Sequence, residues 1–591
     1  MMALKYKKLV GDFETTTDPN DLRVWASCLV DIETNKVVHL ENNIEALYKY
    51  LETKNCVVYY HNLKFDIEWH LAYLLRNGYT HSRKPKEKTF NTLITDQGVV
   101  YFLTVYFKQK NKAWKKVVFY DSLKKLPFSA AKIAKTFELP DQKLKIDYHE
   151  YRAPGHRLTE HERHYIENDC KIIAQALKIQ FSKGLKRMTA AADAMADFKE
   201  RLGRKTFYDH FPVFPIELDD QLRNAYKGGF TYLDPRHKNE IGLQGIVFDV
   251  NSLYPSVMID KPMPYGFPVF GYGEPEPDPD FPLYIVVFEC QFELKPDHIP
   301  TIQIKGGQYH ETEYLTTSAT KNNPDEMVVL TMTSVDYELM KDHYEIKNPI
   351  FIKHWKFRAV TGIFNAYMDH WGNEKINAKD APSRQIAKNM MNNLYGKFAS
   401  NPHSKKKIPY LDKSGVVKYE FEDEEDRDPV YTAVGAFITA YAREKTIRAA
   451  QSVYDRFIYA DTDSLHLVGT ELPDGLDIDP KRLGAWKHEG TFYMSKYIRA
   501  KTYMETMHGT AANTLKNLAL CLSNADWARV DPDDGLIHYI TTKVTCAGMP
   551  DNVKESVDYD NFHEGSVFEG KLMPKRYPGG IVLEERSFTI K

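Results

Sequence analysis

The chain has 591 residues, of which 43% are hydrophobic, and a formal net charge of −2, which together favour three or more structural units with sizeable cores. No apolar run approaches the roughly 18 residues of a membrane helix, no signal-peptide core opens the chain, and the six scattered cysteines form no C-x-x-C pair. These features argue against a membrane protein, a disulfide scaffold and a cysteine-ligated zinc site, and we expect a soluble protein in a reducing compartment.

The near-neutral charge speaks mildly against nucleic-acid binding, although the charges are unevenly spread. Basic runs at 81–88 and 405–407 contrast with acidic runs at 274–280 and 420–428. The ordinary interpretation of one such run is a solvated face. A protein with acids at metal sites and lysines along a groove would also be near neutral.

The first expected strand, residues 8–17, carries two acids close together. Asp12 and Glu14 stand at i and i+2, so an extended backbone turns both toward one face. Carboxylates held that close repel each other unless a cation lies between them. The pair is a candidate metal site if further acids join it.

Two expected helices supply those acids. Asn62 and Asp66 are one helical turn apart. A capping box at Thr159 opens a second helix, on which Tyr165 and Asp169 share a face. Four acids beside a tyrosine suit phosphodiester hydrolysis with two metal ions, since one ion activates water and the other stabilises the leaving oxygen.

This ordered set, with its tyrosine four residues before the last acid, resembles the motifs of the DEDD class of 3′–5′ exonucleases. The resemblance implies an RNase-H-like mixed α/β sheet. Two further stretches, 121–127 and 143–148, are similar to strand-contacting motifs of protein-primed phage polymerases. That similarity implies that Lys143 assists the exonuclease.

Residues between these acids are candidates to hold a frayed single strand, because rings stack on bases and polar groups bind phosphates. Core packing is the alternative for each ring. The candidate rings are Tyr59, His61, Phe65, Phe128 and Tyr148, and the resemblance adds Thr15, Asn62, Ser122 and Leu123 to the predicted contacts.

A glycine pair precedes the next acidic strand. Tyr226, Gly228 and Gly229 form a Tyr-x-Gly-Gly element, whose glycines let the backbone approach DNA closely. A glycine-rich turn without function is the alternative. The apolar strand 246–250 then reaches Asp249 and turns.

A helix in the middle of the chain is expected to present cations to phosphates. Four residues recur at i, i+4, i+8 and i+11, which is one helical face: Arg384, Lys388, Asn392 and Tyr395. Farther along, residues 457–467 predict a β-hairpin with Asp461 and Asp463 at its turn.

In an extended backbone these two acids point the same way, and oxygen-only ligands suit Mg²⁺ or Mn²⁺. Alone, an Asp-x-Asp pair is most often a solvated turn. The metal interpretation therefore needs a third acid on another strand, which Asp249 supplies.

The acid at 249, the cationic helix face and the Asp-x-Asp turn together resemble motifs A, B and C of family-B DNA polymerases, and the chain is most similar to the protein-primed bacteriophage group. The resemblance implies template-directed DNA synthesis with two Mg²⁺ ions per active site, for which Mn²⁺ can substitute. Its implied ligands are Asp249, the Val250 carbonyl and Asp463, with Asp461 in support. The implied partners are a DNA primer–template, dNTPs and a terminal protein primer, for a monomer in the cytoplasm of a bacterial host.

The same resemblance implies further contacts. Tyr254 would pack under the sugar and exclude a 2′-hydroxyl. The implied nucleotide-binding residues are Tyr254, Lys375, Arg384, Lys388, Asn392 and Tyr395. The implied DNA contacts of this half are Tyr226, Gly228, Gly229, Thr439, Arg443, Lys501 and Tyr503. Three residues depart from the family pattern: Arg384, Asn393 and Ala460.

The expected architecture is an exonuclease domain followed by a right-hand polymerase with two inserted subdomains. The predicted limits are exonuclease 1–189, palm 190–260 and 429–544, inserted subdomains 261–362 and 401–428, fingers 363–400, and thumb 545–591. Short strands are expected in the first insertion and in the thumb. We expect the insertions to make synthesis processive and strand-displacing, with Lys305 and Lys405–Lys407 on phosphates.

Two other functions remain open at this point. One is an exonuclease whose polymerase half only clamps DNA, which a primer-extension assay would distinguish. The other is a non-catalytic replication scaffold or binding module. A scaffold would predict eroded acids, whereas all seven acids of the two sites are present.

Overall fold

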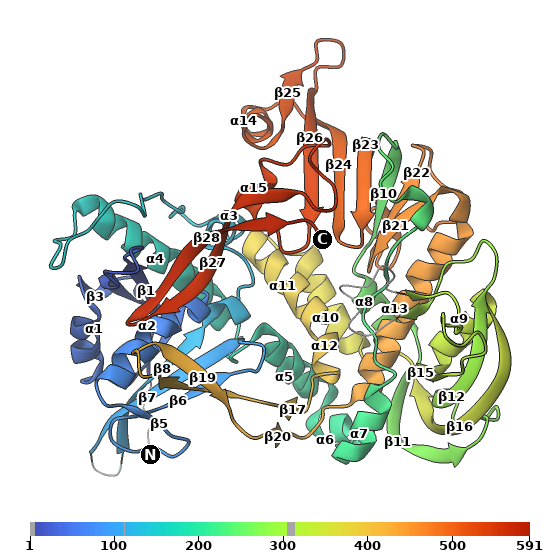
Figure 1. Cartoon of the computed structure of the whole chain (residues 1–591), viewed down its shortest axis with the longest axis horizontal. Helices are drawn as coiled ribbons and strands as arrows, with labels where there is room; N and C mark the ends of the chain where they lie inside the picture. The colour runs from blue at the N-terminus through green and yellow to red at the C-terminus, as the bar shows by residue number, and fades with distance from the viewer. Residues whose placement is uncertain (1–5, 111–112, 304–313) are drawn as a thin grey trace.

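A computed structural model describes residues 6–110, 113–303 and 314–591, and the chain has the mixed α/β, multidomain fold that the sequence predicts. Two large sheets, a smaller sheet and several hairpins are joined by helices (Figure 1). Within these ranges, no helix is both long and apolar enough to cross a membrane. All six cysteines are unpaired and buried.

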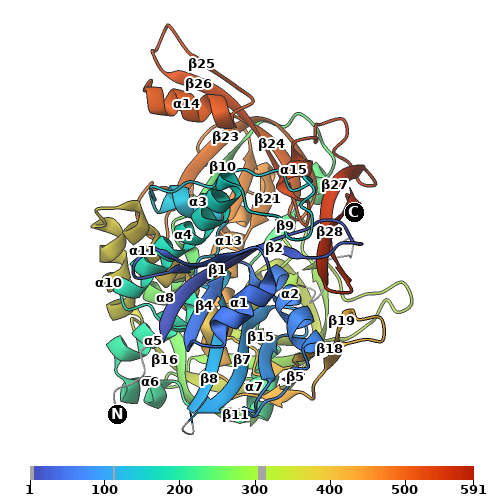
Figure 2. The ribbon, with the colours of Figure 1, turned by 90° about the vertical axis from the view of Figure 1, so that its left-hand side faces the viewer.

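The N-terminal unit is a mixed eight-stranded sheet with the order β3-β2-β1-β4-β8-β7-β6-β5, and Figure 2 views the molecule from the side of this unit. Its strands are β1 (Lys7–Thr15), β2 (Val24–Asp31), β3 (Val37–Glu41), β4 (Cys56–Tyr60), β5 (Thr80–His81), β6 (Thr89–Ile94), β7 (Val100–Lys110) and β8 (Ala113–Asp121). Its helices are α1 (Ile44–Leu51), α2 (Leu63–Arg76), η1 (Ser122–Lys124), α3 (Ala130–Thr136) and α4 (Glu160–Ser182). Both α1 and α4 pack on β2, which is why that strand is buried at all eight positions. Because α4 also packs on β1, the acids of these two elements meet.

The central unit is an eight-stranded sheet with the order β25-β26-β24-β23-β10-β22-β21-β9. Its strands are β9 (Thr231–Leu233), β10 (Gly245–Val250), β21 (Phe457–Asp461), β22 (Ser464–Val468), β23 (Trp486–Arg499), β24 (Thr502–Ala511), β25 (Trp527–Val530) and β26 (Ile537–Cys546). Strand β10 lies between β22 and β23, and its register pairs Asp249 with Ser464. Strands that are far apart in the sequence therefore end side by side.

Helices surround this central sheet. They are α5 (Ala190–Leu202), α6 (Arg204–His210), α7 (Ile216–Arg223), η2 (Pro235–His237), α8 (Leu253–Asp260), α10 (Asn365–Ile376), α11 (Ala381–Asn393), α12 (Tyr395–Phe398), α13 (Thr432–Ser452) and η3 (Tyr454–Arg456). Helix α13 is buried along most of its length because it packs on α7, α8, α12 and β21. Asp380 caps α11 by accepting a hydrogen bond from the Ser383 amide at 2.6 Å.

The segment between α8 and α10 holds a four-stranded sheet with the order β11-β16-β12-β15, against which α9 packs. Its elements are β11 (Met263–Tyr272), β12 (Leu283–Leu294), β13 (Ile302–Gln303), β14 (Tyr314–Leu315), β15 (Val328–Thr333), α9 (Ser334–His343) and β16 (Tyr344–Val360). The prediction of short strands was wrong here, since β12 and β16 run for 12 and 17 residues. Lys305 lies outside the described residues.

Two hairpins approach the N-terminal unit from distant parts of the chain. The first pairs β18 (Lys407–Leu411) with β19 (Val417–Phe421), and β17 (His403–Ser404) with β20 (Glu425–Asp426) at its base. The second is C-terminal and pairs β27 (Val567–Tyr577) with β28 (Gly580–Thr589), after α14 (Leu515–Asn524) and α15 (Asp551–Lys554). Its strands of 11 and 10 residues contradict the short strands predicted there. In Figure 1 the red C-terminal hairpin reaches the blue N-terminal unit next to β19.

The structure confirms some local predictions and corrects others. The capping box is present, since Thr159 Oγ1 accepts from the Glu162 amide and Glu162 accepts from the Thr159 amide. Asn62 precedes α2 rather than belonging to it, with a left-handed φ of 68°. Tyr395 begins a separate short helix, because α11 ends at Asn393, so the expected helical face is not continuous.

Candidate functional site

Two strand ends bring the first pair of acids together. Asp249 closes β10 beside the β21–β22 turn, where the Val250 amide donates to the Asp463 carbonyl at 2.8 Å. Burial, followed by the charges of Asp463 and Glu489, raises the pKa of Asp249 to about 7. Burial also raises the pKa of Asp463. Two partly desolvated carboxylates, one of which disfavours the charge of the other, are suited to hold a divalent cation between them.

The third acid of this site has different partners. Asp461 accepts a hydrogen bond from Thr231 Oγ1 at 3.0 Å and lies 3.4 Å from the Lys501 ammonium. The predicted hairpin is confirmed, but Thr462 has a φ of 62°, so the Asp-x-Asp stretch is a tight turn. The expectation that an extended backbone aligns the two acids was therefore wrong. Asp461 contacts a lysine and a threonine, whereas Asp249 lies within reach of the charges of Asp463 and Lys388.

Cations gather beside this pair of acids. Burial, then the charges of Lys388 and Arg384, lowers the pKa of Lys375, which indicates that the three side chains lie close together. The positive charge of Lys388 favours the ionised form of Asp249, but burial and the Asp463 charge outweigh this effect and the pKa remains raised. Such a cluster suits a polyphosphate, whose charge would relieve the mutual repulsion.

Two stacked rings and an unpartnered amide oxygen belong to residues predicted for this site. The Tyr254 and Tyr395 rings lie 3.9 Å apart at an angle of 17°. The buried Asn392 Oδ1 has no hydrogen-bond partner in the part of the chain that the structure describes. A buried acceptor without a partner is costly, so this oxygen is a candidate for a contact with a ligand.

A second acidic site lies in the N-terminal unit. Carboxylate oxygens of Asp12, Glu14 and Asp169 lie within 4.8 Å of one another, the arrangement that a metal ion requires. Burial and the Asp169 charge raise the pKa of Asp12 to about 7, and burial with the charges of Asp12 and Asp169 raises that of Glu14. Asp66 stands outside this tight group, and burial followed by the Asp12 charge raises its pKa.

A lysine and two tyrosines adjoin these acids. The Lys143 ammonium forms an ion pair with Asp169 and donates to Tyr165 Oη at 2.7 Å. The Tyr148 and Tyr165 hydroxyls are 2.6 Å apart. Tyr148 is 52% exposed, so its ring remains open to a ligand.

The predicted DNA contacts fall into two groups. Most are exposed or half-buried: Thr15, His61, Asn62, Phe65, Leu123, Phe128, Tyr148, Tyr226, Gly228, Gly229 and Lys501. Five are packed inside the protein in this structure: Tyr59, Ser122, Thr439, Arg443 and Tyr503. Ser122 donates to the Tyr60 carbonyl, and Thr439 donates to carbonyls of its own helix. The sequence pattern identified an ordered motif but could not distinguish a residue that touches a ligand from one that holds the loop beside it.

Sequence reasoning also missed two residues at the site of Asp461 and Asp463. Thr231 bonds to Asp461, and Thr446 Oγ1 donates to the Thr462 carbonyl at 2.7 Å. The position of Thr231, directly after the Tyr-x-Gly-Gly element and Phe230, was the one available signal for it. No sequence pattern pointed to Thr446.

Comparisons with known proteins agree with this geometry. The family described as DNA polymerase type B, organellar and viral, matches residues 145–479, and the chain belongs to this family. It is therefore a DNA polymerase, a class of nucleotidyltransferase that uses divalent metal ions.

Its relatives include phage enzymes that it matches over nearly their full length. The chain is 44% identical to the DNA polymerase of Bacillus phage phi29, with all of both chains covered, and 32% identical to that of Streptococcus phage Cp-1, with 98% of each covered. It superposes on phi29 DNA polymerase complexed with primer-template DNA with a TM-score of 0.92 and 42% identity, over 99% of this chain and 100% of that one. The fold is thus that of phi29 DNA polymerase.

Proposed function

We propose that this polymerase replicates a linear phage-type genome by protein-primed, processive, strand-displacing synthesis, and that it proofreads with a 3′–5′ exonuclease. The observation that carries the proposal is the pair of half-buried acids, Asp249 near the end of β10 and Asp463 in the adjoining β21–β22 turn, beside three cations, with a second acidic group in a separate unit. Primer–template DNA and dNTPs are the proposed substrates. A solved phi29 complex contains primer-template DNA and incoming nucleotides, which supports that choice.

The domain assignment that goes with this proposal has seven segments. We assign residues 1–189 to the exonuclease, 190–260 and 429–544 to the palm, 363–400 to the fingers, 545–591 to the thumb, and 261–362 and 401–428 to the inserted subdomains. The terminal protein primer, the monomeric state and the bacterial host cytoplasm rest on the resemblance to protein-primed phage polymerases. The full-length similarity to phage enzymes supports them.

In the polymerase site, Asp249, Asp463 and the Val250 carbonyl would hold two Mg²⁺ ions, for which Mn²⁺ can substitute. When bound, these ions activate the primer 3′-hydroxyl and neutralise the departing pyrophosphate. Lys388, with Lys375 and Arg384, binds the triphosphate. Asp461 keeps Lys501 beside the primer end.

The sugar of the incoming nucleotide meets the stacked rings of this site. The Tyr254 ring is fixed by Tyr395, so it blocks the space that a 2′-hydroxyl would need. Asn392 offers its unpartnered oxygen to the same nucleotide.

In the exonuclease site, Asp12, Glu14, Asp66 and Asp169 would hold the second pair of ions. Lys143 keeps Asp169 and Tyr165 in place, and Tyr165 orients the attacking water. The exposed ring of Tyr148 stacks on the frayed primer end. Hydrolysis would thus occur away from the site of synthesis.

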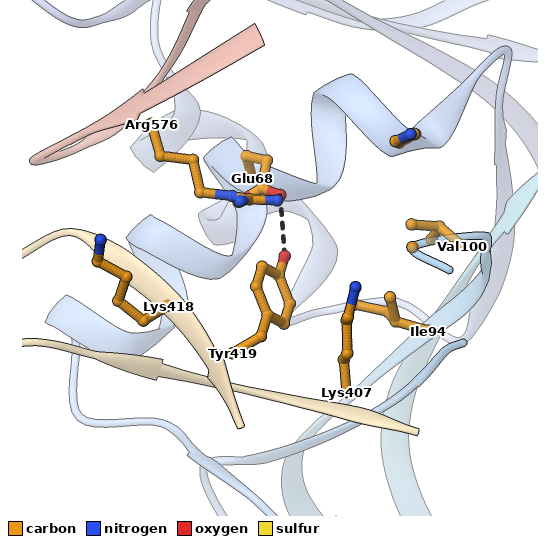
Figure 3. Close-up of a pocket in the computed structure, with 9 residues that line it drawn as sticks. Glu68, Ile94, Val100, Lys407, Lys418, Tyr419 and Arg576 are labelled. Carbon is orange, nitrogen blue, oxygen red and sulfur yellow. Dashed lines mark hydrogen bonds and ion pairs between the residues drawn. The ribbon is translucent and has the colours of Figure 1, made fainter. Parts of the chain in front are cut away.

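The proposal of processive synthesis rests on a junction of three parts of the chain: α2, the second insertion and the C-terminal hairpin. Glu68 Oε1 accepts hydrogen bonds from Tyr419 Oη at 2.9 Å and from Arg576 Nη2 at 2.8 Å. Figure 3 shows these three side chains converging, with a dashed line to the Tyr419 hydroxyl. Tyr419 belongs to the second insertion and Arg576 to the C-terminal hairpin. The Arg576 guanidinium also lies 4.8 Å from the centre of the Tyr419 ring. A closed path of this kind would slow the dissociation of DNA.

The same insertion is fixed to the N-terminal unit at its base. Arg83 pairs with Glu422 at 2.6 Å and with Glu425 at 2.7 Å, and the Asp96 amide donates to the Lys405 carbonyl. Lys406 is paired with Glu425, so it offers less charge to phosphates than the sequence suggested. The support for strand displacement is therefore the anchored position of the hairpin rather than its lysines.

The test of the proposed sites is a labelled primer–template with Mg²⁺, with and without dNTPs. Asp463→Asn should abolish extension while degradation persists, and Asp12→Ala with Asp66→Ala should have the opposite effect. Asp455→Asn, an exposed acid before β21, is the matched control and should leave both activities intact. Substantial extension by the Asp463 variant would refute the metal assignment.

A further inference from the structure

The buried Arg443, on α13, uses its whole guanidinium to join two distant segments. It is 2% exposed and forms five hydrogen bonds. Three go to the Asp336 carboxylate at 2.8–3.1 Å, and two go to the carbonyls of Lys227 and Gly228 at 3.0 and 2.8 Å. A guanidinium has five N–H donors in a fixed plane, so these acceptors define one position for the arginine.

Asp336 is itself held rigidly in the first insertion. It stands in the first turn of α9, where Thr333 Oγ1 accepts from its amide and donates to its carboxylate at 2.8 Å. Its side chain is 15% exposed. A buried charge pair of this geometry is costly to break, because the remaining partner stays desolvated.

The loop that Arg443 holds leads directly to the catalytic turn. A Cβ atom on Gly229 would lie 2.6 Å from Thr462 Oγ1, so the loop backbone rests against that threonine. The Phe230 carbonyl accepts from the Thr462 amide at 2.6 Å, and Thr231 donates to Asp461. The turn that carries Asp461 and Asp463 therefore has part of its support in this loop.

The same helix and the same insertion reinforce the contact. Thr446, one turn after Arg443 on α13, donates to the Thr462 carbonyl. From the first insertion, Tyr314 Oη accepts from the Thr231 amide at 3.2 Å, and its ring packs against Phe230 with centroids 5.3 Å apart. Two independent points of the insertion thus brace the strand that borders the catalytic acids.

We propose that Asp336 is a positioning residue for DNA synthesis: through Arg443 it fixes the Tyr226–Gly229 loop, and through that loop it fixes the Asp461–Asp463 turn at the spacing that metal binding requires. The first insertion is then a structural part of the polymerase site as well as an appendage of it. The proposal rests on the assignment of Asp249 and Asp463 as metal ligands. The Asp336 carboxylate is bonded to Thr333 and Arg443, so it would act on synthesis through the position of the metal-binding turn, and its effect should appear in the metal dependence.

The experiment is single-turnover primer extension over a range of Mg²⁺ concentrations with Asp336→Asn. This variant keeps the side-chain shape but removes the charge opposite Arg443. We expect the Mg²⁺ concentration for half-maximal extension to rise at least about tenfold, while hydrolysis of single-stranded DNA at saturating Mg²⁺ stays within about twofold of wild type. The matched control is Asp342→Asn, which removes an exposed ion pair with Arg448 at 3.0 Å between the same two helices and should change neither value.

A second variant covers the case in which Asp336→Asn does not fold. Arg443→Lys keeps a cation beside Asp336 but lacks the fork that reaches both loop carbonyls, so it should show the same shift in metal dependence. Asp336→Asn or Arg443→Lys with the metal dependence of Asp342→Asn would overturn the proposal. Equal losses of extension and exonuclease activity would also overturn it, since they would mean general destabilisation.

Failure of this inference is distinguishable from failure of the proposed polymerase site. If Asp463→Asn still extends primers, the metal assignment itself is wrong. If that variant is inactive and Asp336→Asn behaves as its control does, only the positioning role is refuted.

Discussion

The junction on α2 provides a quantitative test of the closed path around DNA. Glu68→Gln keeps the shape and an acceptor oxygen but removes the charge that Tyr419 and Arg576 contact. The Glu68 side chain is 4% exposed and that of Arg576 is 41% exposed. Hydrogen bonds to a charged group contribute about 1.5–3 kcal/mol each and are roughly twice as strong as neutral ones.

Replacing the charged acceptor by a neutral one should halve the free energy of each of the two hydrogen bonds. Because Arg576 is partly exposed, its share is reduced by solvent screening, and the total loss of junction stability is about 1.5 kcal/mol. That value corresponds to about a tenfold more frequent opening of the junction. On a primed single-stranded circle with excess competitor DNA, we expect products shortened by up to about tenfold, with single-nucleotide insertion unchanged.

The matched control is Glu584→Gln. It weakens the 2.9 Å pair with Lys575 inside the C-terminal hairpin and leaves the contact with α2 intact. If the Glu68 and Glu584 variants give products of wild-type length, the junction does not retain DNA. Short products from both variants would instead attribute the effect to the hairpin alone.

Three further predictions concern the polymerase half. Tyr254→Val should raise ribonucleotide relative to deoxyribonucleotide insertion by about tenfold, while Tyr254→Phe should not; an unchanged ratio in single-turnover competition refutes the gate. Replacement of residues 402–428 by a short Gly-Ser turn should give short products that stop at duplex, with single-nucleotide insertion nearly normal; full-length displacement products would contradict this. Because the pKa of Asp249 is raised to about 7, protons compete with Mg²⁺ for this carboxylate below pH 7. The Mg²⁺ concentration for half-maximal extension should therefore rise about tenfold per pH unit as the pH falls from 7 to 5. A flat profile would exclude Asp249 as a ligand.

The acids of the N-terminal unit were predictable because their arrangement depends on local periodicity. The spacing of Asp12 and Glu14 on a strand, and of Tyr165 and Asp169 on a helix, needs no knowledge of the rest of the fold. The hairpin at the Asp-x-Asp turn and the capping box at Thr159 are likewise determined by neighbouring residues.

Exposure was not predictable in the same way. The resemblance implied DNA contacts for five residues that the structure buries in the protein: Tyr59, Ser122, Thr439, Arg443 and Tyr503. Whether such a residue faces a groove or the core depends on which elements cover it, and the spacing of the sequence does not contain that information.

The sequence by itself predicted the candidate acids and the kind of chemistry that they suit, since strand periodicity places Asp12 and Glu14 on one face and helix periodicity does the same for Tyr165 and Asp169. Only the tertiary structure decided how the sites are held. Asp336 and Arg443 are 107 residues apart, and Glu68 and Arg576 are 508 apart. Such pairs follow from the packing of whole elements against one another, because no local pattern specifies which distant side chains will share a desolvated contact.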